Sequence, residues 1–401
     1  MKVLHTSDWH LGQRFHNNDR EAEHRLALQW LLETIRREGV DLLVVAGDIF
    51  DISNPPNYAR ELYYRFLSDL RATGCRHAVF IGGNHDSPAM LNAPRELLRA
   101  LDIHVVGHAD ADPAGQCLVL KDPRGRPEAV VAAVPFLRER DLLAGLPGEG
   151  VEARRSRLQE AMVEHFRRVA AHIEAHTPAA ELPVIATGHL YATGAETSAK
   201  QDNIYLGNTE NIRAEQFPDT FDYVALGHIH RPQAVGGREH IRYSGSLIPL
   251  SFSETLDEKS VILLRFEGKA LNDLRELPLP TFRRLKTIED LLVEVKKRLQ
   301  NFSARHREEL PPWVEVIVRS EAPLPGLDAE LRDFCSELHL ELLKIRTTFR
   351  HRALQTEGPV IDLSELEPLE VFRQRCGNLN EDPATMQELE ACFRELLEGL
   401  E

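Results

Sequence analysis

The chain has 401 residues, of which 42% are hydrophobic and 28% charged, and its formal net charge at pH 7 is −15. This composition is typical of a globular protein and excludes fibrous and disordered proteins. The longest apolar runs, such as residues 42–46, are too short to cross a membrane. Five scattered cysteines, never in CxxC spacing, argue against a disulfide framework or a thiolate zinc site and favour a reducing cytoplasm. The polar residues that follow His5 predict that the chain has no secretory signal.

Short aliphatic and β-branched runs alternate with stretches of helical spacing along the first 270 residues. This alternation predicts an α/β protein with buried strands. The expected strands are residues 2–6, 42–46, 78–81, 129–134, 183–187, 223–226, 242–244 and 261–266. The expected helices are residues 19–37, 57–73, 94–101 and 152–176, and residues 109–127, rich in Asp, Pro and Gly, predict a loop or a hairpin.

Two prolines within residues 275–282 end the strand pattern and mark a domain boundary. A small α+β unit is predicted beyond it, from a helix at 288–300, a strand at 313–319, a helix at 327–338 and a strand at 340–347. The last residues have helical spacing and are acidic, because residues 351–401 carry twelve carboxylates against four arginines. We therefore divide the chain into domains 1–278, 279–349 and 350–401.

Five of the predicted strands run into polar residues that can bind metal ions. The motifs are Asp8-x-His10, Gly47-Asp48-x-x-Asp51, Gly83-Asn84-His85-Asp86, Gly188-His189 and Gly227-His228-x-His230. Ligand groups in α/β folds collect at the carboxyl ends of strands, and carboxylate, amide and imidazole donors suit Mn²⁺, Zn²⁺ or Fe²⁺. Period-two alternation places both donors of Asp8-x-His10 on one side of the strand end, and a carboxylate such as Asp48 can bridge two ions about 3.5–4 Å apart.

Two of these motifs are weak evidence by themselves, whereas Gly83-Asn84-His85-Asp86 after a strand is already uncommon. Gly188-His189 alone is typical of a structural histidine, and His228-x-His230 alone could arise by chance among 18 histidines. Five motifs in this order, each following a predicted strand, favour a metal site over the structural interpretation.

The five motifs, together with residues 4–12 and 243–252, resemble the calcineurin-like metallophosphoesterases and, within them, the double-strand-break repair nucleases. The resemblance spans nearly the whole chain and is tightest over residues 1–252. It implies a four-layer α/β/β/α sandwich, a small α+β capping domain and a C-terminal helical segment that docks on a partner ATPase.

The resemblance also implies roles for the motif residues. One ion would be held by Asp8, His10, Asp48 and His230, and the other by Asp48, Asn84, His189 and His228. His85 matches the family histidine that approaches the scissile phosphate without binding metal, and the competing interpretation is that it orients a ligand. Asp51 stands where some archaeal relatives have a second active-site histidine, and we expect His5, Asp51 and Asp86 to orient ligands.

The function implied by the resemblance is hydrolysis of DNA phosphodiester bonds with two divalent cations, for which Mn²⁺ is the expected metal. Such cations would activate a water for in-line attack and stabilise the developing charge. The enzyme would act as an exonuclease and as a hairpin- or structure-specific endonuclease on double-stranded DNA ends and hairpins. No Gly-x-x-x-x-Gly-Lys-Ser/Thr run occurs in the sequence, so any ATP dependence must come from another chain. The resemblance implies that the partner is an SMC-like ABC ATPase and that two copies of this chain form a homodimer within a heterotetramer. It also implies a cytoplasmic, nucleoid-associated location.

Two other functional classes stay open. A metallophosphatase acting on proteins or small phosphoesters could use the same metal ions, and a non-catalytic scaffold could carry a degenerate site. The capping unit and the acidic tail favour the nuclease over a phosphatase, and the intact set of donors argues against the scaffold.

Three apolar features have two interpretations each. Trp9 could stack on a base, but we expect it to pack in the core. The stripe of Tyr58, Leu62, Phe66 and Leu70 predicts either core packing or the dimer interface of the family. In the tail, a helix starting at Asp382-Pro383 predicts either docking on a long-coiled-coil ATPase or packing on the capping unit. Its stripe is Met386, Leu389, Phe393, Leu396 and Leu400.

Overall fold

A computed structural model gives the structure of the chain. It describes residues 1–110, 112–143, 150–177, 181–193, 195, 211–306, 310–349, 372, 389–390 and 392–393. The chain divides into two units, Met1–Thr348 and Phe349–Glu401. Among the helices in these ranges, none combines the length and the apolar character that a membrane span requires.

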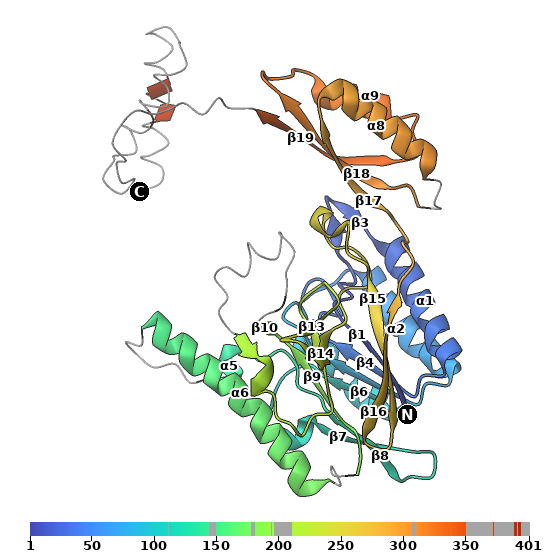
Figure 1. The fold of residues 1–401 in the computed structure, drawn as a ribbon, viewed down its shortest axis with the longest axis vertical. Coiled ribbons are helices and arrows are strands. Elements are labelled where there is room, and N and C mark those ends of the chain that lie inside the picture. Colours follow the sequence, from blue (N-terminus) through green and yellow to red (C-terminus); the bar gives the residue numbers. More distant parts are fainter. Residues whose placement is uncertain are drawn as a thin grey trace. The chain divides into compact units, whose positions relative to one another are not determined.

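Two six-stranded sheets form the centre of the first unit (Figure 1). The first sheet has the order β16-β15-β1-β4-β5-β6, with strands β16 (Ala270–Pro278), β15 (Ser260–Glu267), β1 (Lys2–Thr6), β4 (Leu42–Ala46), β5 (His77–Ile81) and β6 (Ile103–Val106). The second has the order β13-β14-β12-β9-β8-β7, with strands β13 (Gln233–Val235), β14 (Arg238–Tyr243), β12 (Tyr223–Gly227), β9 (Val184–His189), β8 (Pro127–Ala132) and β7 (Cys117–Lys121). Four strands in each sheet are parallel, β1-β4-β5-β6 and β14-β12-β9-β8, so their carboxyl ends lie along one edge of the sheet.

The two sheets and their helices make four layers. The inner faces of the sheets pack together through side chains such as Val44 and Ile185. Helices α1 (Glu21–Glu38) and α2 (Asn57–Leu70) pack on the outer face of the first sheet, where Leu31 and Phe66 are buried. Helix α6 (Val151–His176) packs on the second sheet through Phe166. The predicted α/β/β/α sandwich is confirmed.

Shorter elements connect these layers. They are β2 (Arg14–Phe15), β3 (Asn18–Asp19), α3 (Pro88–Asn92), α4 (Arg95–Arg99), α5 (Glu139–Leu142), β10 (Tyr191–Thr193) and β11 (Asn211–Arg213). Residues 109–127 are predicted to form a loop or a hairpin. The hairpin is confirmed, because β7 pairs antiparallel with β8. Strands β6 and β16 are missing from the prediction; both are edge strands, and β16 is too rich in exposed polar residues to show a buried-strand pattern.

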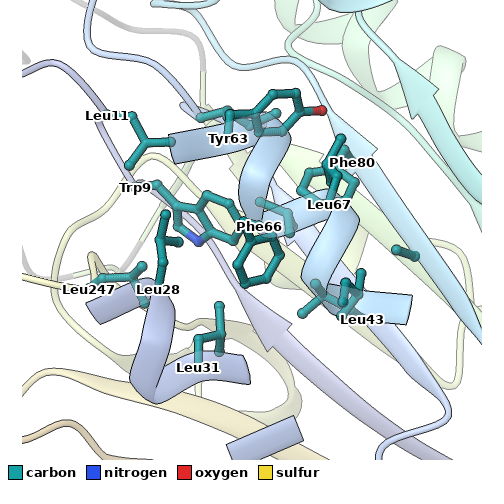
Figure 2. Packing of buried hydrophobic residues seen from close by; sticks show 14 of the residues in the cluster. Trp9, Leu11, Leu28, Leu31, Leu43, Tyr63, Phe66, Leu67, Phe80 and Leu247 are labelled. Atoms are coloured by element: carbon teal, nitrogen blue, oxygen red, sulfur yellow. The ribbon is translucent and has the colours of Figure 1, made fainter. Parts of the chain in front are cut away.

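Trp9 is a core residue, as expected (Figure 2). Its indole is fully buried, with ring centroids 5.0 Å from Phe66 and 5.8 Å from Phe80, and its Nε1 donates a hydrogen bond to Thr6 Oγ1 at 3.1 Å. This packing anchors the segment between Asp8 and His10 to the hydrophobic core under α2.

The apolar stripe of α2 also belongs to this core. Leu62, Phe66 and Leu70 are buried, and Tyr58 packs against the same cluster. The stripe itself is therefore not available as a dimer interface.

The small α+β domain has its own hydrophobic core, which includes Val295, Val316 and Leu331. It contains β17 (Leu285–Asp290), α8 (Leu292–Arg305), β18 (Trp313–Ser320), α9 (Leu327–Cys335) and β19 (Glu341–Phe349), with the strand order β17-β18-β19. The predicted start of a helix at Ile288 is wrong. Ile288 pairs with Val316 in a parallel ladder, and the three-residue spacing of the buried Leu285 and Ile288 imitates a helical turn.

Little of the tail is described. Phe372, Leu389 and Phe393 are helical, and the rings of Phe372 and Phe393 stack with centroids 4.2 Å apart. The predicted helix start and the rest of its stripe lie outside the described residues, namely Asp382, Pro383, Met386, Leu396 and Leu400.

Candidate metal centre

The seven predicted donors meet where the carboxyl ends of the two sheets come together. His189, at the end of β9 in the second sheet, donates a hydrogen bond from Nδ1 to the carbonyl oxygen of Ala46 in β4 at 2.9 Å. The backbone N–H of His228, after β12, donates to Asp8 Oδ1 at 2.9 Å. These contacts join the motifs of one sheet to those of the other.

A first group of donors consists of Asp8, His10 and His230. One potential ligand atom of each lies within 4.8 Å of those of the other two. The rings of His10 and His230 have centroids 5.1 Å apart, and Asp8 and His10 are buried. This is the set that the resemblance assigned to one ion, apart from Asp48.

A second group consists of Asp48, His189 and His228, with potential ligand atoms again within 4.8 Å of one another. Asn84 completes it, because its Oδ1 lies 3.0 Å from His189 Nε2 and 3.0 Å from His228 Nδ1. The convergence of an amide oxygen and two imidazole nitrogens on one point is the arrangement that a shared cation requires.

Asp48 lies between the two groups. Its Oδ2 is 3.5 Å from His10 Nε2 and 3.3 Å from His189 Nε2, and its Oδ1 accepts a hydrogen bond from the backbone N–H of His85 at 3.0 Å. One carboxylate thus faces a donor of each group, as the bridging assignment requires.

Buried ring nitrogens test whether this site fits cations. His10 Nε2 and His230 Nδ1 are buried and have no hydrogen-bond partner among the described residues. Buried polar atoms without a partner are rare and costly in folded proteins. Together with the carboxylates of Asp8 and Asp48, these nitrogens fit a pair of divalent cations better than a purely structural network.

Four of the seven donors have strained backbone. The φ angles are +52° at Asp8, +46° at His10, +48° at Asp48 and +101° at His228, in a region that residues with a Cβ seldom adopt. Close packing of the loops requires glycine beside them, since a Cβ on Gly83 would collide with the carboxylate of Asp48. Such strain is typical of functional sites that the surrounding fold holds in place.

Of the three residues expected to orient ligands, Asp51 contacts a proposed ligand and Asp86 contacts the ligand loops, whereas the His5 ring hydrogen-bonds to Tyr223 and Leu226 and to no proposed ligand. Asp51 Oδ1 lies 3.0 Å from His10 Nδ1. The carboxylate of Asp86 accepts hydrogen bonds from the backbone N–H groups of Phe50 at 2.9 Å and Gly83 at 2.8 Å. It therefore connects the loop that carries Asp48 to the loop that carries Asn84. His5 lies deeper, 3.0 Å from Tyr223 Oη, and burial lowers its pKa to about 3.

The charges of the site shift the pKa values of its members. Burial disfavours protonated His10, but the hydrogen bond to Asp51 and the carboxylate of Asp48 outweigh it and raise the pKa of His10 to about 9. Burial also opposes protonation of His189, and the charge and hydrogen bond of Asp48 raise its pKa to about 9. Conversely, these two histidines hold the pKa of Asp48 well below its usual range despite its burial.

His85 lies at the exposed rim of the site. Its Nδ1 donates to the carbonyl oxygen of Asp51 at 2.6 Å, and its ring lies edge-on to His10 with centroids 4.9 Å apart. Because one ring nitrogen is occupied by a backbone carbonyl, only Nε2 remains for substrate. His10, Asp51 and His85 also lie close enough together to bind a cation, which keeps the alternative role of His85 open to test.

Glu254 and Lys259 contact the site and are absent from the sequence prediction. Glu254 Oε1 lies 3.6 Å from His230 Nδ1, and Lys259 Nζ donates to Glu254 Oε2 at 2.7 Å and to the carbonyl oxygen of His230 at 2.8 Å. Burial opposes ionisation of Glu254, but the charge of Lys259 lowers its pKa overall. Glu254 lies two residues beyond the recognised stretch 243–252, and no ligand spacing marks it.

Comparison with known proteins identifies two families along the chain. The calcineurin-like phosphoesterase family matches residues 1–232, and the family described as type 5 capsule protein repressor C-terminal domain matches residues 281–378. The chain is 38% identical to the SbcD subunit of the nuclease SbcCD from Escherichia coli (strain K12), over 100% of this chain and 98% of the relative. It is 36% identical to the protein of the same name from Rhodobacter capsulatus, over 93% of both chains, and 34% identical to that from Bacillus subtilis, over 66% of both.

Proposed function

This chain belongs to the calcineurin-like phosphoesterases and, within them, to the SbcD subunits of SbcCD nucleases, and we propose that it cleaves DNA as a Mn²⁺-dependent exonuclease and hairpin endonuclease. As a member of that family it is a metal-dependent nuclease. The observation that carries the proposal is the convergence of seven donors in two groups with Asp48 between them.

The proposed ligands of one ion are Asp8, His10, Asp48 and His230, and those of the other are Asp48, Asn84, His189 and His228. When bound, two divalent cations supply an activated water and neutralise charge on the transferred phosphoryl group. The chain itself orients the ligands: Asp51 holds His10 through Nδ1, and the Ala46 carbonyl holds His189 through Nδ1, which leaves Nε2 of each ring for an ion.

His85 is proposed to protonate the leaving oxygen. The carbonyl of Asp51 keeps a proton on His85 Nδ1, so an imidazolium at this position can release its Nε2 proton and remain as a stable neutral tautomer. The backbone N–H of His85 is bonded to Asp48, which places the ring beside the proposed bridging carboxylate. A general acid so held contributes to cleavage without binding metal.

The partners belong to the same proposal. The relatives are named as subunits of SbcCD complexes, and this sequence has no phosphate-binding loop, so we assign the ATPase to a separate SbcC-type, SMC-like ABC subunit. Double-stranded DNA ends and hairpins are the proposed substrates, in the cytoplasm at the nucleoid. For a homodimer within a heterotetramer, we propose exposed apolar side chains such as Tyr64 and Leu97 as contacts, because Leu62, Phe66 and Leu70 of the α2 stripe are core.

Cleavage assays test this function directly. The full chain with its ATPase partner would be given blunt and hairpin duplexes and p-nitrophenyl phosphate, with Mn²⁺ or with chelator and with or without ATP. We expect Mn²⁺-dependent cleavage of both duplexes and ATP stimulation only when the partner is present. Hydrolysis of the small phosphoester without DNA cleavage would replace the nuclease by a metallophosphatase.

A further inference from the structure

Arg138 lies beside the metal centre and has no place in the roles described so far. It follows β8 and precedes α5, on the side of the site formed by the second sheet. Its Nη2 donates a hydrogen bond to the carbonyl oxygen of Asp86 at 3.0 Å. Asp86 directly follows Asn84 and His85, so the guanidinium is attached to the loop that carries a proposed ligand and the proposed general acid.

The other terminal nitrogen of the guanidinium, Nη1, has no hydrogen-bond partner among the described residues. Arg138 Nη1 is buried, yet it makes no hydrogen bond to any described residue, and no described carboxylate forms an ion pair with Arg138. An arginine cannot escape this cost by losing its proton. The carboxylates of Asp141, Asp86 and Asp48 attract the charge from a distance, without an ion pair.

An aromatic ring fixes the position of this cation. The Arg138 Cζ atom lies 5.8 Å from the centroid of the Phe136 ring, and Phe136 lies against His189 with ring centroids 6.2 Å apart. Phe136 thus connects Arg138 to a proposed ligand of the second ion. A guanidinium held by a carbonyl and a ring, with a free Nη1, is preorganised for an anion.

We propose that Arg138 binds a phosphate of the DNA strand held in the metal centre. The proposal rests on the proposed nuclease function, and it adds a substrate-binding residue to that site. Phosphate is the anion that such a site meets, and the planar fork of arginine matches its oxygens better than the point charge of lysine. The contact would hold the strand while His85, on the same loop, acts on the leaving oxygen.

A neutral phosphate analogue can identify this contact. The full complex would be tested with Mn²⁺ on duplexes that carry one methylphosphonate at successive positions near the end, by cleavage kinetics and by fluorescence anisotropy. We expect Arg138→Gln to lower kcat/KM and DNA affinity by about 10- to 100-fold, the usual effect of losing a charged hydrogen bond. A methylphosphonate at one position should lower the kcat/KM and the DNA affinity of the wild type by a similar factor. The same substitution should cause no further loss in Arg138→Gln.

Arg140 provides a matched control, because it is an exposed arginine two residues away whose Nε lies 3.7 Å from Asp141. Arg140→Gln should behave as the wild type, and Arg138→Lys should recover part of the loss. If Arg138→Gln remained as sensitive as the wild type to methylphosphonate at every position, or if it lost Mn²⁺ binding by calorimetry, Arg138 would be a structural residue.

The two proposals can fail separately. DNA binding that depends on Arg138 and on one phosphate, without any cleavage, would support this inference and reject the nuclease function. Cleavage by the wild type without coupling between Arg138 and any phosphate would keep the nuclease function and reject the inference.

Discussion

Asp48 shows how closely the charges of the site depend on one another. Its carboxylate lies within 3.5 Å of nitrogens of His10 and His189, and both histidines have pKa values raised to about 9. Without cations, protons on these rings balance the buried carboxylates. Divalent cations would take over that role and displace the protons, since imidazole binds metal only in its neutral form.

The bridging position of Asp48 predicts unequal effects of substitution. Asp48→Ala should weaken both Mn²⁺ sites, whereas His10→Ala should weaken mainly one, because only Asp48 faces both groups of donors. Isothermal titration calorimetry of the two variants counts the sites. Two unchanged binding events in Asp48→Ala would show that Asp48 is not shared.

The raised pKa values predict proton release on metal binding. Below pH 9, His10 and His189 are protonated in the cation-free protein, so Mn²⁺ must displace protons. Apparent affinity should therefore rise between pH 7 and pH 9, by about tenfold per pH unit for each proton released. Calorimetry in buffers of different ionisation enthalpy measures the protons, and affinity that does not change with pH would contradict the assignment.

His85 allows a separation of chemistry from binding. His85→Ala should retain Mn²⁺ and DNA binding while cleavage falls by roughly 10²–10⁴-fold, because only the proton donor is lost. Single-turnover cleavage and metal titration on the same preparation give both quantities. A parallel loss of one metal ion would instead make His85 a ligand, in the group with His10 and Asp51.

Among the elements, the segment after His10 connects the metal centre to the small α+β domain. The Phe15 ring of β2 stacks on Trp313 of β18, with centroids 5.5 Å apart and planes 11° apart. Glu23 of α1 contacts Arg20 at 2.5 Å and Arg283 at 3.3 Å, and the Arg283 Cζ atom lies 4.3 Å from the Trp313 ring centroid. Buried charge and aromatic contact together hold this domain against the nuclease domain.

This connection depends on Glu23, whose side chain is 1% exposed and which balances two arginines. Glu23→Gln should lower the free energy of unfolding by about 3–5 kcal/mol, because it leaves buried positive charge uncompensated. Urea unfolding measures the change. Glu21→Gln is the control, since Glu21 on the same helix forms an exposed pair with Arg25 that is worth at most about 1 kcal/mol. Equal effects of the two variants would exclude the buried pair as a stabilising contact.

The complete chain combines separate hydrophobic cores with an acidic tail. Three clusters stabilise the sandwich, a fourth stabilises the α+β domain and a small fifth joins Phe15 to Leu285 and Trp313, all within Met1–Thr348. Phe349–Glu401 is a separate unit. Within it, the rings of Phe372 and Phe393 stack on each other, and Leu389, a member of the predicted tail stripe, is 38% exposed. The domain boundaries 278/279 and 349/350 stay predictions.

Truncation after residue 350 therefore leaves all seven donors and all five clusters in place. The truncated chain should fold, bind Mn²⁺ and keep some nuclease activity. It should lose stable association with the ATPase and any stimulation by ATP, because the proposed docking segment is absent. Co-purification with the partner measures association, with full-length Phe393→Ser as a milder variant of the tail. Complex formation at wild-type strength by the truncated chain would place the docking surface elsewhere.

Local patterns in the sequence predicted an α/β protein, polar donors after five of its strands and the core role of Trp9, whereas the four-layer sandwich and the assignment of seven donors to two ions came from the family resemblance. Short motifs after the predicted strands locate the donors whatever the rest of the chain does. The period-two alternation predicted for Asp8-x-His10 is wrong, because both residues have positive φ angles and lie beyond the extended strand. Three-dimensional packing was needed to show that Ile288 is in a strand, that Asp48 faces both groups of donors, and that Glu254 and Arg138 reach the site. These features depend on contacts between segments far apart in the chain. His189 comes to Ala46 across 143 positions, and no spacing in the sequence records such a distance.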